Sequence, residues 1–460
     1  MYSGADFTTT QDPAMANPTT DTARRLPLVL GAALALLALG ARAQQEAPCP
    51  AELPAGTTCH AGRDANGSYY WIAKPANWNG VLVVHSHGGP RLPAPKPESE
   101  LADLKRFAII VKEGFAMAAA SYREGGYIGI AASAEDSENL RRIYVEKFGA
   151  PRRTIAHGQS WGGAVAAYQV ERYAKGADGK PAYDGALLTS GVVAGNGLAY
   201  DFRADLRAVY QYYCGNHPRA DEPQYPLWMG LPAATKLAAK EVRARLDECT
   251  GLNLPADKRS AEQKRRLANL LGVLHVVEKG LPGHLNWSTL LFQDIVHKRL
   301  GGKNPFTNVG VRYTGSDDDE ALNKGVARFE ADPEAAASFA ADGALTGKVA
   351  IPVLTMHAIG DPTVFVEQDS VYRATLEKGG SGDRLVQTFT REAEHSYLGT
   401  PQYAALLEAL MKWVDAGEKP TPQSVAALCE KHAARHEGGC HFDTAYRPKP
   451  LESRQYPRTK

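Results

Sequence analysis

The chain has 460 residues, of which 44% are hydrophobic and 22% are charged, a balance typical of globular proteins rather than of disordered chains or coiled coils. Its 52 Lys and Arg residues nearly equal its 51 Asp and Glu residues, so the sequence offers no excess positive charge for binding a nucleic acid. The length suffices for a sizeable core, either in one large domain with an insertion or in two medium domains.

Residues 1–43 are predicted to form a secretory signal peptide. Two arginines precede the uncharged apolar run 26–39, and the small-residue site Ala41–Ala43 follows it. The run is shorter than the roughly 20 apolar residues that span a membrane, which disfavours a stable membrane anchor. We therefore expect cleavage near Ala43 and a secreted or periplasmic protein. The residues before Met15 do not resemble a signal peptide, so Met15 is a possible true start.

Residues 44–193 are predicted to form the N-terminal part of an α/β core. Residues 81–84 form a continuous apolar run, as in a strand that is buried on both faces of a parallel sheet. Further strands alternate with helical spacing at short intervals, which predicts the α/β class with a mainly parallel sheet. The other expected strands cover 115–121, 154–156 and 185–193, and the expected helices cover 98–114, 136–148 and 163–173.

A glycine-rich motif lies between one of these strands and the next helix. Gly158-Gln159-Ser160-Trp161-Gly162 has the pattern G-x-S-x-G, at a point where the strand must turn abruptly into the helix. Such a turn exposes the serine hydroxyl, and its glycines let neighbouring backbone approach closely. The motif predicts Ser160 as a nucleophile, and a plain glycine-rich turn is the alternative interpretation.

A second glycine-rich segment, His85-Ser86-His87-Gly88-Gly89-Pro90, follows the strand at 81–84. The negative charge that develops on a tetrahedral oxygen requires N–H donors. We expect these donors to be the backbone N–H of Trp161 and that of Gly89 or Gly88. The two histidines are expected to brace the loop, because no further metal ligands cluster near them. Tyr122, just past the next strand, is a candidate for a contact with the substrate. The alternative is that it belongs to a segment that forms a structural ion pair.

Residues 194–347 are predicted to form a helical cap. They are rich in Lys, Arg, Glu and Ala with helical periodicity, and an insertion of this length should have its own packing. Tyr212 and Tyr213 are candidates for lining a substrate pocket, and the alternative is that they form the core of the cap. The acidic run 317–320 lacks the alternating spacing of a calcium loop and is interpreted as a solvated turn.

Residues 348–417, the C-terminal part of the core, carry a candidate acid and base. Asp361 follows an expected strand at 351–356, and His395 follows another at 385–390. A serine hydroxyl needs such a base, and the base needs an orienting acid. The chain order of serine, acid and histidine is the one that G-x-S-x-G enzymes use. Alternative acids are Glu367 and Glu394, and alternative bases are His357, His85 and His87.

Six cysteines follow the predicted cleavage site and fall into three local pairs, 10, 35 and 11 residues apart. An even number in an exported chain predicts disulfides. The expected bridges are Cys49–Cys59, Cys214–Cys249 and Cys429–Cys440. A zinc site at Cys429, Cys440 and His441 is the alternative for the last pair, but the C-x-x-C spacing is missing. Residues 418–460 are thus predicted to form a disulfide-stapled tail, and we expect neither a metal nor a cofactor.

Together these segments resemble the α/β-hydrolase superfamily. The resemblance rests on His87-Gly88-Gly89, the motif around Ser160, Asp361 and His395, and it covers roughly residues 69–417. It implies an eight-stranded, mostly parallel sheet flanked by helices, and hydrolysis through an acyl-enzyme. The chain is also similar to the esterase and prolyl-peptidase branches, in which a Trp after the nucleophile and a helical cap both occur. Pro90 departs from the hormone-sensitive-lipase branch, which has a third glycine there.

The sequence thus predicts a secreted serine hydrolase of carboxylic esters. Its expected substrate is a small-molecule ester or, alternatively, a short peptide trimmed at its N-terminus. A peptidase would need acidic cap groups for the substrate ammonium, and Asp205, Glu241 and Glu248 are available. A non-catalytic binding protein is an alternative of another class, which the presence of all three triad residues disfavours. The sequence makes no prediction of the oligomeric state.

Overall fold

The computed structural model of the chain describes residues 45–176 and 179–458. The predicted signal peptide therefore lies outside the described residues. None of the helices in the described ranges combines the length and the apolar character that a membrane span requires.

The core is one sheet with the strand order β1-β2-β3-β5-β4-β6-β7-β8-β9. The strands from β5 to β9 in this order pair in parallel, and the pairs β1–β2, β2–β3 and β3–β5 are antiparallel. The sheet has one strand more than the predicted eight, since the three-residue β1 adds to its edge. The bounds are β1 Gln45–Ala47, β2 Thr58–Arg63, β3 Tyr69–Lys74, β4 Val81–Ser86, β5 Ala116–Ala120, β6 Arg153–Gln159, β7 Gly185–Thr189, β8 Val353–Ala358 and β9 Leu385–Thr390.

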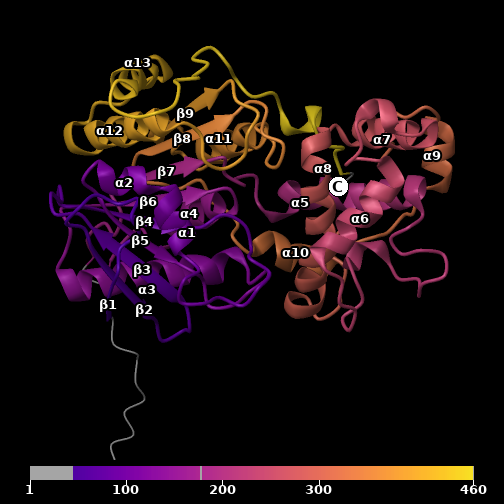
Figure 1. The fold of residues 1–460 in the computed structure, drawn as a ribbon, viewed down its shortest axis with the longest axis horizontal. Coiled ribbons are helices and arrows are strands. Elements are labelled where there is room, and N and C mark those ends of the chain that lie inside the picture. The colour runs from indigo at the N-terminus through magenta and orange to yellow at the C-terminus, as the bar shows by residue number, and fades with distance from the viewer. Residues whose placement is uncertain (1–44, 177–178, 459–460) are drawn as a thin grey trace, which may run out of the picture. The chain divides into compact units, whose positions relative to one another are not determined.

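Helices cover both faces of the sheet (Figure 1). Strands β4, β5, β7, β8 and β9 are buried along their whole length, as expected of a sheet enclosed between two helical layers. One layer comprises α1 Leu101–Arg106, α2 Ala108–Lys112, α12 Thr400–Ala416 and α13 Pro422–Ala433. The other layer comprises α3 Ile130–Phe148, α4 Trp161–Arg172 and α11 Gln368–Lys378.

Two helices of the core differ from the prediction. The expected helix at 98–114 is two short helices, α1 and α2, that meet at Phe107. Helix α3 begins at Ile130, six residues before the expected start at 136. Its first N–H groups, those of Ile130 and Ala131, donate to the carboxylate of Asp342 at 3.0 and 3.1 Å. Because Asp342 lies more than 200 positions later in the chain, no local pattern could predict this helix start.

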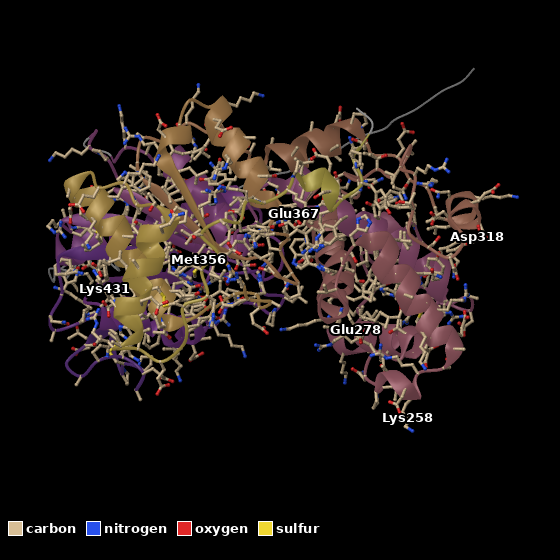
Figure 2. All side chains as sticks on the ribbon, turned by 90° about the horizontal axis from the view of Figure 1, so that it is seen from above. Lys258, Glu278, Asp318, Met356, Glu367 and Lys431 are labelled. Atoms are coloured by element: carbon tan, nitrogen blue, oxygen red, sulfur yellow. A yellow bond between two sulfur atoms is a disulfide. The ribbon has the colours of Figure 1, made fainter. Side chains whose placement is uncertain are left out.

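Residues 194–347 contain only helices and loops in the structure (Figure 1). They enclose an apolar core of their own, which also contacts the start of α4. In Figure 2 the labelled Lys258, Glu278 and Asp318 lie in this cap, and Met356 lies in the sheet. The cap helices are α5 Asn196–Cys214, α6 Ala239–Thr250, α7 Ala261–Leu274, α8 Leu281–Asn286, α9 Asp319–Gly325 and α10 Pro333–Ala341, with π-helical segments at Trp287–Leu291 and Asp294–Arg299. Single 3-10 turns lie at Leu227–Met229, Ala256–Lys258, Glu278–Gly280, Gly382–Arg384 and Leu451–Ser453.

The C-terminal segment contains more regular structure than the predicted disulfide-linked tail. It contains α13, which begins with a capping box at Thr421 and a proline at its first position. The chain then runs back to the cap helices (Figure 1). There the Tyr456 hydroxyl donates to the Val273 carbonyl at 2.8 Å, and Arg458 pairs with Asp205 at 3.0 Å. The tail therefore belongs both to the core and to the cap.

The six cysteines form the three disulfides that the sequence predicts, and none is free. Cys49–Cys59 ties the start of the described chain to β2, Cys214–Cys249 ties the end of α5 to α6, and Cys429–Cys440 links α13 to the chain after it. The zinc alternative at Cys429 and Cys440 is wrong, because both sulfur atoms are used in one disulfide.

Candidate active site

Ser160 occupies a strained turn between β6 and α4. Its backbone has a φ of 57° and a ψ of −124°, in a region that residues other than glycine rarely adopt. The turn also requires its glycines, because a Cβ atom at Gly158 would collide with the Gly162 carbonyl and one at Gly162 with the Ser86 carbonyl. The backbone N–H of Ser160 donates to the Thr189 carbonyl of β7 at 2.9 Å. The motif thus holds the serine at the carboxyl edge of the parallel strands.

His395 lies between Ser160 and Asp361. Its Nε2 is 2.9 Å from the Ser160 Oγ, and its Nδ1 is 2.8 Å from the Asp361 Oδ2. A carboxylate only accepts, so Nδ1 carries the proton and Nε2 is free to accept from the serine hydroxyl. The three residues follow β6, β9 and β8, whose carboxyl ends meet at one edge of the sheet. This geometry is that of a serine nucleophile with a base and an orienting acid.

The carboxylate of Asp361 receives hydrogen bonds at both oxygens. Its Oδ1 accepts from the backbone N–H groups of Thr363 and Val364 at 2.8 and 2.9 Å, and its Oδ2 accepts from His395. Burial by itself would raise the pKa of Asp361, but hydrogen bonds from His357 and His395 hold the pKa well below its ordinary value. The group is therefore an anion that fixes the His395 ring.

A second histidine, His357 of β8, lies behind Asp361. Its Nδ1 is 2.6 Å from the Asp369 Oδ2, and its Nε2 is 3.0 Å from the Val364 carbonyl and 3.3 Å from the Asp361 Oδ2. All of these partners are acceptors, so both ring nitrogens carry protons. Burial lowers the pKa of His357, but the carboxylates of Asp369 and Asp361 outweigh it and raise the pKa to about 10. The sequence suggested His357 only as an alternative base; the structure makes it a buried cation that supports the acid.

The segment after β4 is braced by aromatic packing. The His87 ring lies against the Tyr122 ring with centroids 4.0 Å apart, and the Tyr122 hydroxyl donates to the His87 carbonyl at 3.2 Å. Burial lowers the pKa of His87 to about 3, so this ring is neutral. Tyr122 is buried and its hydroxyl is engaged, which is a bracing position; its contact with substrate stays a prediction.

The two candidate oxyanion glycines differ in their surroundings. Gly88 packs so closely on the Gln159 side chain that a Cβ atom would collide with the amide oxygen. Gly89 has a φ of +64° and open space where its Cβ would be. Trp161 is the first residue of α4, where helical N–H groups lack partners within the helix. The backbone N–H groups of Gly89 and Trp161 are therefore the better pair of candidate donors.

The structure does not bring Tyr212 and Tyr213 to the site. They contact each other near the C-terminal end of α5, next to the Cys214–Cys249 disulfide, with ring centroids 4.9 Å apart. Tyr212 also packs on Gly325 of α9. Two other residues of α5 reach the acid loop, the segment 359–367 between β8 and α11 that contains Asp361. The Arg203 Nη2 is 3.5 Å from the Thr363 carbonyl, and the Phe202 ring packs on that of Phe365 with centroids 4.5 Å apart. Since Tyr212 lies nine residues beyond Arg203 along α5, the helical rise separates these two residues by about 14 Å.

Several cap groups near the acid loop were missed by sequence reasoning. Gly280 approaches the loop so closely that a Cβ atom would collide with the Pro362 carbonyl. Arg203 is 4% exposed and lies against the rings of Phe202 and Trp287. Burial lowers the pKa of His284 far below its ordinary value, so this histidine is neutral. These residues lie in ordinary helical patterns, and only the folding of the cap onto the core sets them beside the acid loop.

The alternative acids lie elsewhere. Glu394 is exposed and pairs with Lys279 at 2.6 Å, and Glu367 lies 3.7 Å from Arg454. His85, an alternative base, is buried with its Nδ1 2.9 Å from the His157 Nδ1. None of these contacts involves Ser160 or His395.

One group in the described part of the chain could in geometry hold a metal ion, and it lies away from Ser160. Glu113, His432 and His436 bring ligand atoms within 4.8 Å of one another. The Arg435 guanidinium already lies among them, 2.7 Å from the His432 Nδ1 and 3.6 Å from Glu113. An arginine in that position supplies the positive charge that a metal ion would bring, so we regard the group as an ion-pair cluster.

Comparison with known proteins gives distant likenesses. No family model matches the chain. An o-phthalyl amidase of Xanthobacter agilis is 25% identical, with 79% of this chain and 89% of that protein covered. Among solved structures, feruloyl esterase B from Aspergillus oryzae matches with a TM-score of 0.43 and 13% identity over 82% of this chain and 87% of its own. An esterase from Aspergillus oryzae matches with a TM-score of 0.41 and 12% identity over 79% and 80% of the two chains.

The topology agrees with the predicted fold class. Six parallel strands, a strained serine turn directly after β6, and an acid and a histidine after β8 and β9 make up an α/β-hydrolase fold. The helical insertion enters after β7, at the edge of the sheet that carries the site, and leads back to the start of β8.

Proposed function

We propose that this chain, which has the α/β-hydrolase fold, is an exported serine hydrolase that cleaves carboxylic esters through an acyl-enzyme. Ser160 is the nucleophile, His395 the base and Asp361 the acid. The observation that carries this proposal is the continuous hydrogen-bonded row from Asp361 through His395 to Ser160, with links of 2.8 and 2.9 Å. The three disulfides support the assignment to an oxidising compartment.

In the first half of the reaction Ser160 is acylated. The Ser160 Oγ forms a bond to the ester carbonyl carbon while its proton moves to the His395 Nε2. The negative charge on the former carbonyl oxygen is stabilised by the backbone N–H groups of Trp161 and Gly89. The bond to the leaving oxygen then breaks, and His395 returns the proton to that oxygen. The alcohol departs and the acyl group remains on Ser160.

In the second half a water molecule repeats the same steps. It gives a proton to the His395 Nε2 and its oxygen bonds to the acyl carbon, and the collapse of this second intermediate restores the Ser160 hydroxyl and releases the acid. Asp361 stays ionised throughout and stabilises the imidazolium that forms twice in each cycle. Its two backbone hydrogen bonds suit this role, because they keep the carboxylate from turning away from the ring.

Amide hydrolysis is the second candidate. The relative named o-phthalyl amidase supports it, since most of both chains is covered in that comparison. The chemistry requires only that His395 protonate a leaving nitrogen in place of an oxygen.

An N-terminal peptidase has less support, because the acidic cap groups have other partners. Asp205 accepts from the Tyr313 hydroxyl at 2.7 Å and from Arg458, Glu241 caps the start of α6, and Glu248 pairs with Arg219. The buried cation of Arg203 beside the acid loop would also repel a substrate ammonium. A non-catalytic binding protein has no use for the strained backbone of Ser160, whose cost is of order 1–3 kcal/mol.

The test compares p-nitrophenyl esters with p-nitroanilides of the same acyl groups in pre-steady-state kinetics, with the substrate in excess over the enzyme. We expect a burst of nitrophenol that equals the enzyme concentration, and covalent labelling of Ser160 by a fluorophosphonate. Ser160→Ala should lower the rate by several orders of magnitude, and the matched variant Ser453→Ala, at an exposed serine with only a local hydrogen bond, should not. Retention of more than about a tenth of the activity in Ser160→Ala would contradict the proposal.

A further inference from the structure

Arg203 is a buried cation at the boundary between cap and acid loop. Its guanidinium donates only to neutral oxygens, at 3.3 Å to the Ala199 carbonyl and at 3.5 Å to the Thr363 carbonyl. Its Nε has no acceptor, and no carboxylate of the described residues lies within 4.0 Å of the guanidinium. A buried charge without a counter-ion is costly, so a group of this kind is poised to accept an anion from outside the chain.

Two partly buried arginines in or against the cap have acidic partners. Arg458 pairs with Asp205 at 3.0 Å, and Arg245 pairs with Glu222 at 2.6 Å. Arg207, one turn further along α5, also lacks a carboxylate, but it donates to the His217 carbonyl inside the cap and does not contact the acid loop. Arg203 therefore combines two properties, a missing counter-ion and a position beside the acid loop.

The neighbours of Arg203 are flat aromatic surfaces. Its guanidinium carbon lies 4.7 Å from the ring centroid of Phe202, 4.8 Å from that of Trp287 and 5.3 Å from that of Tyr200. These contacts offset part of the cost of burying the charge. Burial lowers the pKa of Arg203 to about 10, so the group remains a cation at neutral pH.

The same rings form a continuous row toward the nucleophile. Trp287, which is partly exposed, stacks on Tyr200 with centroids 4.4 Å apart and meets Tyr127 edge-on at 6.2 Å. Tyr127 in turn meets Trp161 at 5.9 Å, and Trp161 directly follows Ser160. These ring contacts connect the residue that follows the nucleophile with the surroundings of the guanidinium.

We infer that the site takes acyl groups built on an aromatic ring that carries a free carboxylate, and that Arg203 binds this carboxylate. The planar guanidinium matches a carboxylate through two parallel N–H···O bonds, and the anion supplies the missing counter-ion. The inference rests on the proposed function of the same site, and it adds the substrate class. The structural alternative is that Arg203 only braces α5 against the Thr363 carbonyl.

The first experiment needs no variant. The p-nitrophenyl esters of 2-, 3- and 4-carboxybenzoic acid are compared with those of the matching carbamoylbenzoic acids, which have the same shape without the charge. After correction for uncatalysed hydrolysis, at least one carboxylate isomer should exceed its carbamoyl partner in kcat/KM by about tenfold or more. Equal values for all three pairs would overturn the inference.

The second experiment uses two arginines on one helix. Arg203→Met should abolish the preference for carboxylate over carbamoyl substrates, and Arg203→Lys should retain part of it. Arg207→Met, which removes an equally buried charge one turn away, should leave the preference unchanged even where it lowers the melting temperature. An unchanged preference in a folded Arg203→Met variant would contradict the inference.

Binding separates this inference from the proposed function. Benzoate and the three benzenedicarboxylates should raise the melting temperature of the Ser160→Ala variant, and the corresponding amides should not. If no ester is hydrolysed but the carboxylates still bind through Arg203, the proposed reaction fails and the anion site stands. If esters are hydrolysed but carboxylates and amides bind alike, the result contradicts the anion site at Arg203 and supports the proposed reaction.

Discussion

At the scale of single residues, the site depends on how Asp361 is held. Its Oδ1 closes a turn with the N–H groups two and three positions later, at 2.8 and 2.9 Å. A glutamate at this position has one more methylene and could not make the same short turn. The other oxygen is shared by His395 and His357, so one carboxylate connects the reactive side of the site with a buried cation behind it.

The acid can be tested by replacing its charge alone. Asp361→Asn should lower kcat by up to about 10⁴-fold, because an amide no longer holds the His395 ring in the correct tautomer. Asp369→Asn is the matched control, since Asp369 contacts His357 but neither His395 nor Ser160. We expect this control to stay within about tenfold of the wild type. Equal losses in the two variants, measured by steady-state kinetics, would mean that the substitutions disturb the fold instead.

His357 should make the stability of the protein depend on pH. Its pKa in the folded state, about 10, lies above the ordinary value of 6.5, so its contribution is fully present below pH 6.5 and is lost as the pH rises toward 10. Urea unfolding across this range should show a falling free energy of unfolding in the wild type. His357→Gln should flatten that part of the curve. A variant with the same slope as the wild type would show that the imidazolium does not contribute.

At the scale of elements, α5 divides into two halves with different tasks. Its N-terminal half carries Phe202 and Arg203 to the acid loop, and its C-terminal half packs inside the cap and ends at the Cys214–Cys249 disulfide. Both halves contain many buried residues, so burial alone does not distinguish them. What distinguishes them is the approach of the cap to Pro362 and Thr363.

This division predicts which aromatic residues determine substrate choice. Trp287→Ala should change kcat/KM unequally across esters with acyl groups of different size, because Trp287 is partly exposed in the aromatic row beside Arg203. Tyr212→Ala should change kcat/KM for all esters by factors that agree within about twofold, since this side chain packs on Gly325 of α9. The measurement is a kcat/KM series from acetyl to benzoyl esters. Selectivity that shifts in Tyr212→Ala but not in Trp287→Ala would reverse the assignment.

At the scale of the whole molecule, core and cap are joined by several distant contacts. Asp342 of the cap caps α3 of the core, and the C-terminal segment crosses from α13 to the cap, where Arg458 pairs with Asp205. Removal of Arg458 would leave a buried carboxylate without its cation. The chain after the second part of the core therefore takes part in fixing the cap above the site.

Export and oxidation can be tested on the protein produced from the full sequence. The mature chain should begin at or near Gln44, and it should show no reactive thiol under denaturing, non-reducing conditions. Each disulfide should contribute about 2–4 kcal/mol, so reduction should lower the melting temperature. N-terminal sequencing and thiol titration provide the readouts. Six titratable thiols in protein recovered from the periplasm or the medium would contradict the proposal.

The sequence by itself determined the features that local patterns report. The glycines around Ser160 mark a turn that only they permit, and Asp361 and His395 each follow a buried apolar run, so strand ends could be recognised without knowing how the strands pair. The disulfides were predictable because each pair is close in the chain.

Only the tertiary structure decided which distant side chains support these residues. Asp342 starts α3 from 212 positions away, His357 lies between Asp361 and Asp369, and Arg203 reaches the acid loop while Tyr212 does not. The physical reason is that hydrophobic periodicity records which face of an element is buried, but not against what it is buried. The partners of a buried charge depend on how the elements pack, and in this chain that packing joins segments more than 150 residues apart.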